Sequence, residues 1–117
     1  MAVDPGIPSG ERTPLGDEPA FVAGLIEVAE GTYAWLQPNG GLGESNAGLI
    51  VGDGESLLID TLWDERLTKR MLAAMEPVTA AAEAPVTRLF NTHGDGDHWY
   101  GNGLLDPEVE ILATEAA

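Results

Sequence analysis

Both histidines of the chain lie in one six-residue stretch, His93-Gly94-Asp95-Gly96-Asp97-His98, which also carries two aspartates. Two imidazoles and two carboxylates on so short a loop are costly to desolvate unless a cation binds them. Imidazole nitrogen and carboxylate oxygen are good ligands for zinc, and they also suit iron and manganese. The intervening glycines let the backbone fold tightly enough for the side chains to converge. The stretch therefore predicts a divalent-metal site with His93, Asp95, Asp97 and His98 as candidate ligands.

Two other interpretations of this stretch compete with a metal site. A surface turn rich in glycine and aspartate would bind nothing. A calcium loop would need oxygen ligands at alternate positions and a terminal glutamate. Here Trp99 stands at the fifth position counted from Asp95, and two histidines flank the acids. The calcium loop therefore fits poorly, and the turn without a ligand is the alternative that stays open.

Apolar runs separated by turns place this loop in a chain of mixed α and β structure. The clearest signal is a hairpin, because Gly52-Asp53-Gly54-Glu55 separates two apolar runs and supplies the positive φ angles of a tight turn. A buried strand leads directly into the histidine–aspartate loop. The order of elements indicates an α+β fold, and we expect strands at 25–29, 33–36, 48–51, 56–60, 86–90 and 109–113.

One helix is expected between the hairpin and the histidine–aspartate loop, from about Asp64 to Met75. Pro77 would end or disrupt this helix, because proline cannot donate its hydrogen bond. Residues 80–84 could form a further turn. Residues four apart would form the apolar face of the helix, namely Trp63, Leu67, Met71 and Met75.

The stretch Thr92-His93-Gly94-Asp95-Gly96-Asp97-His98, followed by Tyr100-Gly101-Asn102, resembles the metal-binding signature of the metallo-β-lactamase fold superfamily. That signature reads His-x-His-x-Asp-His, follows a buried strand and is usually preceded by threonine. Upstream, Leu57-Leu58-Ile59-Asp60-Thr61 and the helix after it stand in the order of this family. The resemblance implies part of a four-layer αββα sandwich, in which a mixed sheet carries a helix on one face.

The resemblance also implies roles for individual residues. His93 would bind a first metal ion, and Asp97 and His98 would bind a second, so one or two zinc ions are expected. Asp60 would be a buried acid that orients ligand side chains from beneath the site. Asp60 or Thr61 could instead cap the following helix.

Two features depart from the family pattern. Asp95 stands where the family usually has histidine, and a carboxylate is a harder ligand. The first site could therefore favour iron or manganese, or the protein could use mainly the second site. The remaining ligands of the family come from a second half, and the 117 residues contain no third histidine. The chain is thus expected to be the N-terminal portion of such a domain, residues 21–117, after a flexible tail, residues 1–20.

The resemblance implies a metal-dependent hydrolase, in which metal-activated water attacks an ester, thioester, amide or lactam carbonyl. Asp97 would orient this water or accept its proton. Trp99 and Tyr100 would lie at the mouth of the site or pack in the core. The alternatives are an iron-dependent oxidoreductase on the same fold and a non-catalytic metal-binding fragment.

Composition narrows the expected partners. Twenty acidic and five basic residues give a formal net charge of −15, which disfavours nucleic acids and anionic membrane surfaces. The chain has no cysteine, so disulfides and thiolate metal sites are excluded. The N-terminus has no secretory pattern, and a cytoplasmic protein with a small-molecule substrate is expected. Half a sandwich would expose one sheet face, so we expect self-association through Leu49, Val51, Leu57 and Ile59 or their neighbours.

Overall fold

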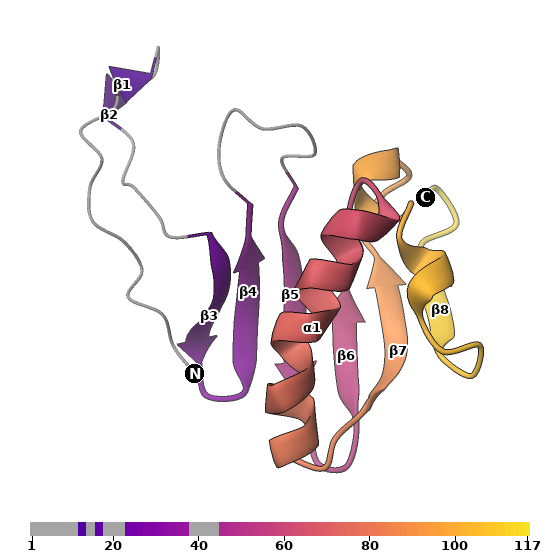
Figure 1. Cartoon of the computed structure of the whole chain (residues 1–117). Helices are drawn as coiled ribbons and strands as arrows, with labels where there is room; N and C mark the ends of the chain where they lie inside the picture. The colour runs from indigo at the N-terminus through magenta and orange to yellow at the C-terminus, as the bar shows by residue number, and fades with distance from the viewer. Residues whose placement is uncertain (1–11, 14–15, 18–22, 38–44) are drawn as a thin grey trace.

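A six-stranded mixed sheet with one helix across it forms the body of the computed structural model, which describes residues 12–13, 16–17, 23–37 and 45–117 (Figure 1). The strands follow the order β3-β4-β5-β6-β7-β8, antiparallel from β3 to β6 and parallel from β6 to β8. The expected α+β class is confirmed. The strands are β3 (Gly24–Ala29), β4 (Thr32–Leu36), β5 (Ala47–Val51), β6 (Ser56–Ile59), β7 (Val86–Asn91) and β8 (Glu110–Ala113).

The predicted tail, residues 1–20, falls mostly outside the described residues. Within it, β1 (Arg12–Thr13) and β2 (Gly16–Asp17) pair antiparallel as a separate two-stranded sheet. The division of the chain near residue 20 stays a prediction.

The hairpin expected from the glycine-rich turn is the β5–β6 pair. Its register joins Val51 to Ser56, and Gly54 has a φ of 79°. Strand β6 ends at Ile59, one residue earlier than expected, because Asp60 adopts a φ of 68° and leaves the extended conformation. This early end turns the chain toward the histidine–aspartate loop.

The helix α1 (Glu65–Ala81) begins at Asp64, whose side chain accepts a hydrogen bond from the backbone of Leu67. The expectation that Pro77 ends the helix is wrong, since α1 continues through it. The residues after Pro77 are rich in alanine, the best helix former, and Val78 packs against the core, so the loss of one hydrogen bond is outweighed. The helix ends where Glu83 adopts a φ of 52°.

The core lies between α1 and one face of the sheet. The strands contribute Leu49, Leu58 and Leu89, and the helix contributes Met71 and Met75, all at most 2% exposed. Three of the four residues expected on the apolar face of the helix are buried there. Trp63 is the exception, because it precedes the helix and is 38% exposed.

No helix of the described part of the chain lies over the opposite face of the sheet (Figure 1). The expectation that Leu49 and Val51 lie on this face is wrong, since Leu49 is fully buried in the core and Val51 packs against it. Alternation along the strands puts their neighbours there instead. These residues are Ile50, Leu57, Ile59, Phe90 and Leu112, of which Ile50 is 41% and Leu112 38% exposed.

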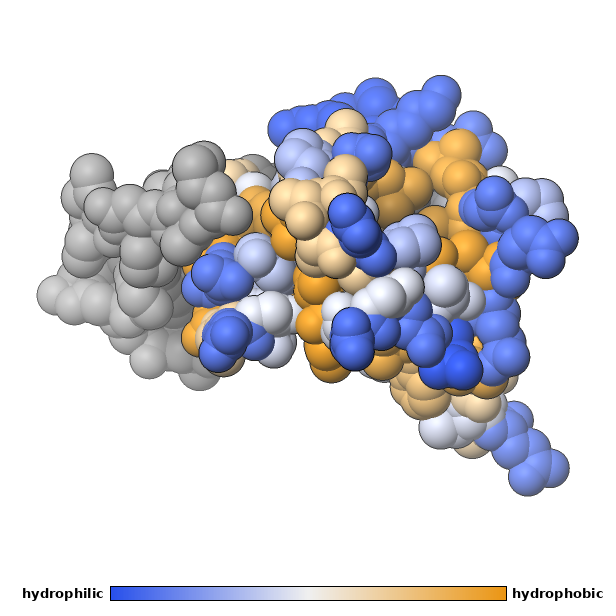
Figure 2. Space-filling model, turned by 90° about the horizontal axis from the view of Figure 1, so that it is seen from below, coloured by the Kyte–Doolittle hydropathy of each residue, from blue (hydrophilic) through white to orange (hydrophobic). Residues whose placement is uncertain are grey.

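Hydrophobic residues also reach the surface at the end of the molecule that is lowest in Figure 1. Seen from below, orange apolar residues lie among the blue polar ones (Figure 2). Among the described residues, no helix is both long and apolar enough to cross a membrane.

Candidate metal centre

The histidine–aspartate loop lies where two parallel strands end side by side. Strands β6 and β7 pair with Ile59 opposite Phe90, so the residues that follow them emerge at the same edge of the sheet. Asp60 follows β6, and Thr92 and His93 follow β7. Parallel pairing thus brings together residues more than thirty positions apart in the chain.

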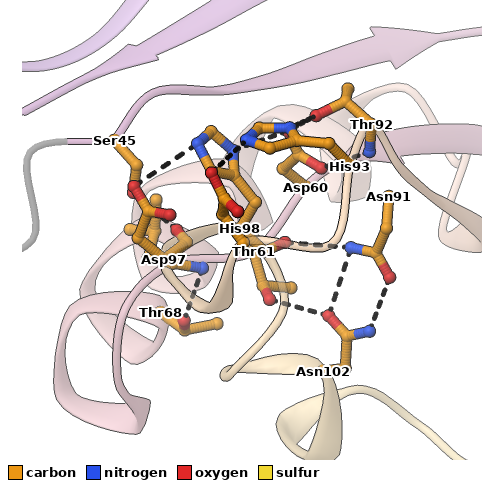
Figure 3. A network of polar contacts seen from close by, with 12 residues as sticks. Ser45, Asp60, Thr61, Thr68, Asn91, Thr92, His93, Asp97, His98 and Asn102 are labelled. Carbon is orange, nitrogen blue, oxygen red and sulfur yellow. Dashed lines mark hydrogen bonds and ion pairs between the residues drawn. The ribbon is translucent and has the colours of Figure 1, made fainter. Parts of the chain in front are cut away.

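Asp60 is the buried centre of this arrangement and is only 3% exposed. Its Oδ1 atom accepts a hydrogen bond from the backbone of Thr92 at 2.8 Å. Its Oδ2 atom lies 2.8 Å from both the hydroxyl of Thr92 and Nδ1 of His98 (Figure 3). The alternative that Asp60 or Thr61 caps the helix is wrong, because Asp64 occupies that position.

The same hydrogen bonds determine which nitrogen of each histidine is free. The single proton of the Thr92 hydroxyl is donated to Asp60, so this oxygen accepts from Nδ1 of His93 at 2.7 Å. Nδ1 of His98 donates to Asp60 in the same way. Each neutral ring then keeps a lone pair on Nε2, the atom that can bind a metal. The two rings lie 4.2 Å apart between their centroids.

Two carboxylates face these free nitrogens. Oδ2 of Asp95 lies 3.6 Å from Nε2 of His93, and Oδ2 of Asp97 lies 3.5 Å from Nε2 of His98. Ligand atoms of His93, Asp95 and Asp97 fit within 4.8 Å of one another, and so do those of Asp60, His93 and His98. All five predicted site residues are therefore brought together.

The backbone of the loop is held by three polar residues, of which Ser45 and Asn91 were not candidates in the sequence. The hydroxyl of Ser45, which precedes β5, donates to the carbonyl of Asp97 at 2.7 Å. The carbonyl of His98 accepts from the backbone of Thr61 at 3.1 Å and from the side chain of Asn91 at 2.9 Å. Asn91 directly precedes the loop, and a polar residue at the end of a buried strand is a signal that could have drawn attention to it.

Close packing holds the end of the loop against α1. A Cβ atom at Gly101 would lie 2.0 Å from Oγ1 of Thr68, so only glycine fits there. Trp99 and Tyr100 are 43% and 51% exposed, which excludes the alternative that they pack in the core. The centroid of the Tyr100 ring lies 5.5 Å from that of the Trp63 ring, so the side chains of Tyr100 and Trp63 lie together beside the loop.

The comparisons with known proteins agree with this geometry. Residues 40–111 match the family model of the metallo-beta-lactamase superfamily. The chain belongs to this superfamily. The match covers the β5–β6 hairpin, the helix and the whole histidine–aspartate loop.

Solved metallo-β-lactamases share the fold at low sequence identity. The enzyme from Hirschia baltica superposes with a TM-score of 0.61 at 23% identity, over 78% of this chain and 42% of its own. The mono-zinc form of FIM-1 from Pseudomonas aeruginosa superposes with a TM-score of 0.62 at 20% identity. The superposition covers 78% of this chain and 41% of FIM-1. DIM-1 exposed to ceftazidime superposes with a TM-score of 0.61 at 23% identity, over 78% of this chain and 42% of DIM-1. The chain thus spans about two fifths of the length of these metallo-β-lactamases, consistent with the N-terminal half of such a fold.

The donor set of this chain fits a divalent cation. Two Nε2 atoms with free lone pairs and two carboxylates converge on one short loop. Nitrogen and carboxylate oxygen ligands suit zinc, iron and manganese alike. The loop could therefore hold a metal ion, and the hydrogen bonds beneath it orient both histidine rings with Nε2 free.

Proposed function

We propose that this chain carries the metal-binding loop of a metal-dependent hydrolase. The observation that supports the proposal most directly is the convergence of the free Nε2 atoms of His93 and His98 with the carboxylates of Asp95 and Asp97. Superfamily membership supports the same conclusion. Because the chain spans about two fifths of the solved relatives, the activity is proposed for the whole protein that contains it.

In this proposal His93, Asp95, Asp97 and His98 hold one or two zinc ions. A bound zinc ion lowers the pKa of water toward neutrality and polarises the carbonyl of an ester, thioester, amide or lactam. Asp60 orients His98 from below, and Thr92 does the same for His93. Asp97 is 32% exposed at its side chain, so one of its oxygens can orient the attacking water or accept its proton.

The test is hydrolysis of a panel of small esters, thioesters and lactams by the protein that contains this chain, with and without added zinc. Asp97→Asn should lower kcat by roughly 10²–10⁴-fold, the usual contribution of a positioned acid or base. Asp53→Asn, in the exposed β5–β6 turn, removes the same charge away from the loop and should leave the rate unchanged. Zinc binding without hydrolysis of any substrate would instead favour a non-catalytic metal-binding module.

Asp95 supports a second candidate, an iron-dependent oxidoreductase on the same fold. Its carboxylate faces Nε2 of His93, and a carboxylate favours harder metals than imidazole does. Metal analysis of the purified protein, compared with Asp95→His, distinguishes the candidates. Iron in the wild type and zinc in the variant would support the iron-dependent oxidoreductase. The same metal at the same content in both proteins would contradict a role of Asp95 in metal choice.

The substrate class, the cellular location and the binding partners stay predictions. We propose a small-molecule substrate and a cytoplasmic location, and the charge of −15 argues against nucleic acids and anionic membranes. Cell fractionation and a binding assay with DNA and anionic vesicles would test these points.

A further inference from the structure

Three polar side chains form a second support beneath the loop, apart from Asp60. The hydroxyl of Thr61 donates to Oδ1 of Asn102 at 2.7 Å, and Nδ2 of Asn102 donates to Oδ1 of Asn91 at 2.7 Å. Nδ2 of Asn91 then donates to the carbonyl of His98 at 2.9 Å. Figure 3 shows Thr61, Asn91 and Asn102 below the rings of His93 and His98. Thr61 is fully buried and Asn91 is 7% exposed.

The direction of this chain of hydrogen bonds is forced. The carbonyl of His98 can only accept, so Asn91 must present its amide nitrogen to it and its amide oxygen to Asn102. Asn102 must then present its own nitrogen to Asn91 and its oxygen to Thr61. The hydroxyl of Thr61 is therefore the donor that starts the series. Each amide has one orientation that satisfies all three bonds.

The series joins both ends of the histidine–aspartate loop. Asn91 is the last residue of β7, just before the loop, and Asn102 begins the short 3-10 turn that follows it. Thr61 follows Asp60 and also donates its backbone N–H to the carbonyl of His98. His98 is thus held at its ring by Asp60 and at its main chain by Thr61 and Asn91.

We propose that Asn102 is a positioning residue for the metal centre, acting through Asn91 on the main chain of His98. This inference rests on the proposed metal-binding function of the loop. Asn102 makes no hydrogen bond to the side chains of the candidate metal ligands among the described residues. It holds the amide oxygen of Asn91 in place, and the amide nitrogen of Asn91 in turn holds the carbonyl of His98. Residues that orient metal ligands typically change metal affinity about 10–100-fold when mutated.

The variant Asn102→Asp tests this directly in the 117-residue chain. Aspartate can still accept from Nδ2 of Asn91, as Asn102 does at 3.5 Å, but it places a second oxygen where Asn102 has its donor, 2.7 Å from Oδ1 of Asn91. Two acceptors at this distance repel, so we expect Asn91 to shift away from the carbonyl of His98. The added negative charge by itself would favour a cation. We therefore expect zinc affinity, measured by calorimetric titration, to fall about 10-fold or more despite that charge. We also expect the visible absorption of the cobalt(II)-loaded chain to change.

The matched control is Asn46→Asp, which adds the same charge at an exposed residue. Asn46 acts only as an acceptor in its hydrogen bond from the backbone of Gln37, and aspartate preserves that role. Its zinc affinity and cobalt spectrum should equal those of the wild type. Equal affinity and an equal spectrum for Asn102→Asp would overturn the proposal.

A second pair of variants covers the case in which Asn102→Asp does not fold. Thr61→Val keeps the shape of the buried side chain but removes the donor, whereas Thr61→Ser keeps the hydroxyl. We expect weaker zinc binding and an altered cobalt spectrum in the valine variant, and restoration of both in the serine variant. Valine and serine variants that bind zinc equally well would also overturn the proposal.

Failure of the proposed function can be told apart from failure of this inference. If the wild-type chain binds neither zinc nor cobalt, the metal-binding function fails. The series of hydrogen bonds is then judged by NMR of the metal-free chain. Slow exchange of the side-chain amide protons of Asn91 and Asn102, lost in Thr61→Val and kept in Thr61→Ser, would support their coupling. Fast exchange in the wild type would contradict it.

Discussion

Nδ1 of His98 lies 2.8 Å from Oδ2 of Asp60, although 38 residues separate them in the chain. The parallel pairing of β6 with β7 brings these residues together, because it aligns the ends of the two strands. The positive φ of Asp60 then turns its carboxylate toward the loop. This contact links the strand that ends the hairpin to the ring of a candidate metal ligand.

Replacing the Asp60 carboxylate should weaken the metal centre. Asparagine tolerates a left-handed φ as aspartate does, so Asp60→Asn removes the charge and one acceptor without new backbone strain. We expect zinc affinity to fall about 10–100-fold. The free energy of unfolding should fall by about 1–3 kcal/mol, because a buried donor loses its partner. Calorimetry and urea unfolding measure the two effects.

The control for this prediction is Asp64→Asn. It removes the same charge at the start of α1, where asparagine caps a helix as well as aspartate does. Its zinc affinity and stability should stay close to those of the wild type. If both variants bound zinc alike, Asp60 would have no special role in the centre.

The close approach of Gly101 to α1 predicts a steric effect. Gly101 has a φ of −89°, which alanine can adopt, but its Cβ would lie 2.0 Å from Oγ1 of Thr68. We expect Gly101→Ala to lower the free energy of unfolding by about 1–3 kcal/mol, as overpacking usually does. Gly103→Ala is the control, since nothing lies within 4 Å of a Cβ there. Urea unfolding of the two variants should separate them clearly, and equal stability would refute the clash.

The uncovered sheet face predicts self-association of the 117-residue chain. Ile50 is 41% exposed on that face. Ile50→Lys should shift the chain toward the monomer in analytical ultracentrifugation, because a charge buried between apolar faces is costly. The control, Ile111→Lys, adds the same charge on the other face, where Ile111 pairs with the core residue Leu89 and is 52% exposed. A wild-type chain that is monomeric at high concentration would contradict the prediction.

Tyr33, which lies far from the loop, predicts how the stability of the fold changes at alkaline pH. Glu27 faces Tyr33 across β3 and β4. The pKa of Tyr33 is raised because its hydroxyl donates a hydrogen bond to the Glu27 carboxylate, because the hydroxyl is partly desolvated, and because the carboxylate is negatively charged. The folded state therefore keeps this proton to higher pH than the unfolded state. The stabilisation is complete below the ordinary tyrosine pKa of about 10 and is lost as pH rises through the raised value.

The variant Glu27→Gln should lower the pKa of Tyr33 toward its ordinary value. Absorbance at alkaline pH measures the change, and Tyr100→Phe in both proteins leaves Tyr33 as the remaining tyrosine, since the chain has two. Glu30→Gln, an exposed neighbour, is the control. An unchanged titration in Glu27→Gln would show that the pairing with Glu27 does not set this pKa.

The sequence alone determined the elements and the chemistry of the loop. Local patterns were sufficient for the hairpin around Gly54, for the burial of Leu67, Met71 and Met75, and for the grouping of His93 with His98 on one loop. These features depend on residues close together in the chain, where alternation, helical spacing and turn chemistry act directly. The prediction for Pro77 is wrong because packing of the helix, which is a tertiary property, outweighs a local preference.

Only the tertiary structure decided how the loop is held. The contacts of Asp60, Thr61 and Ser45 with the loop join segments far apart in sequence, and no local pattern encodes the parallel register that brings Asp60 and Thr61 to it. The same holds for the face on which each apolar residue lies, because a one-residue shift of register would exchange Leu49 with Ile50. The candidate ligands are evident in the sequence, and the pairing of β6 with β7 decides which of the histidine nitrogen atoms are free to bind a metal.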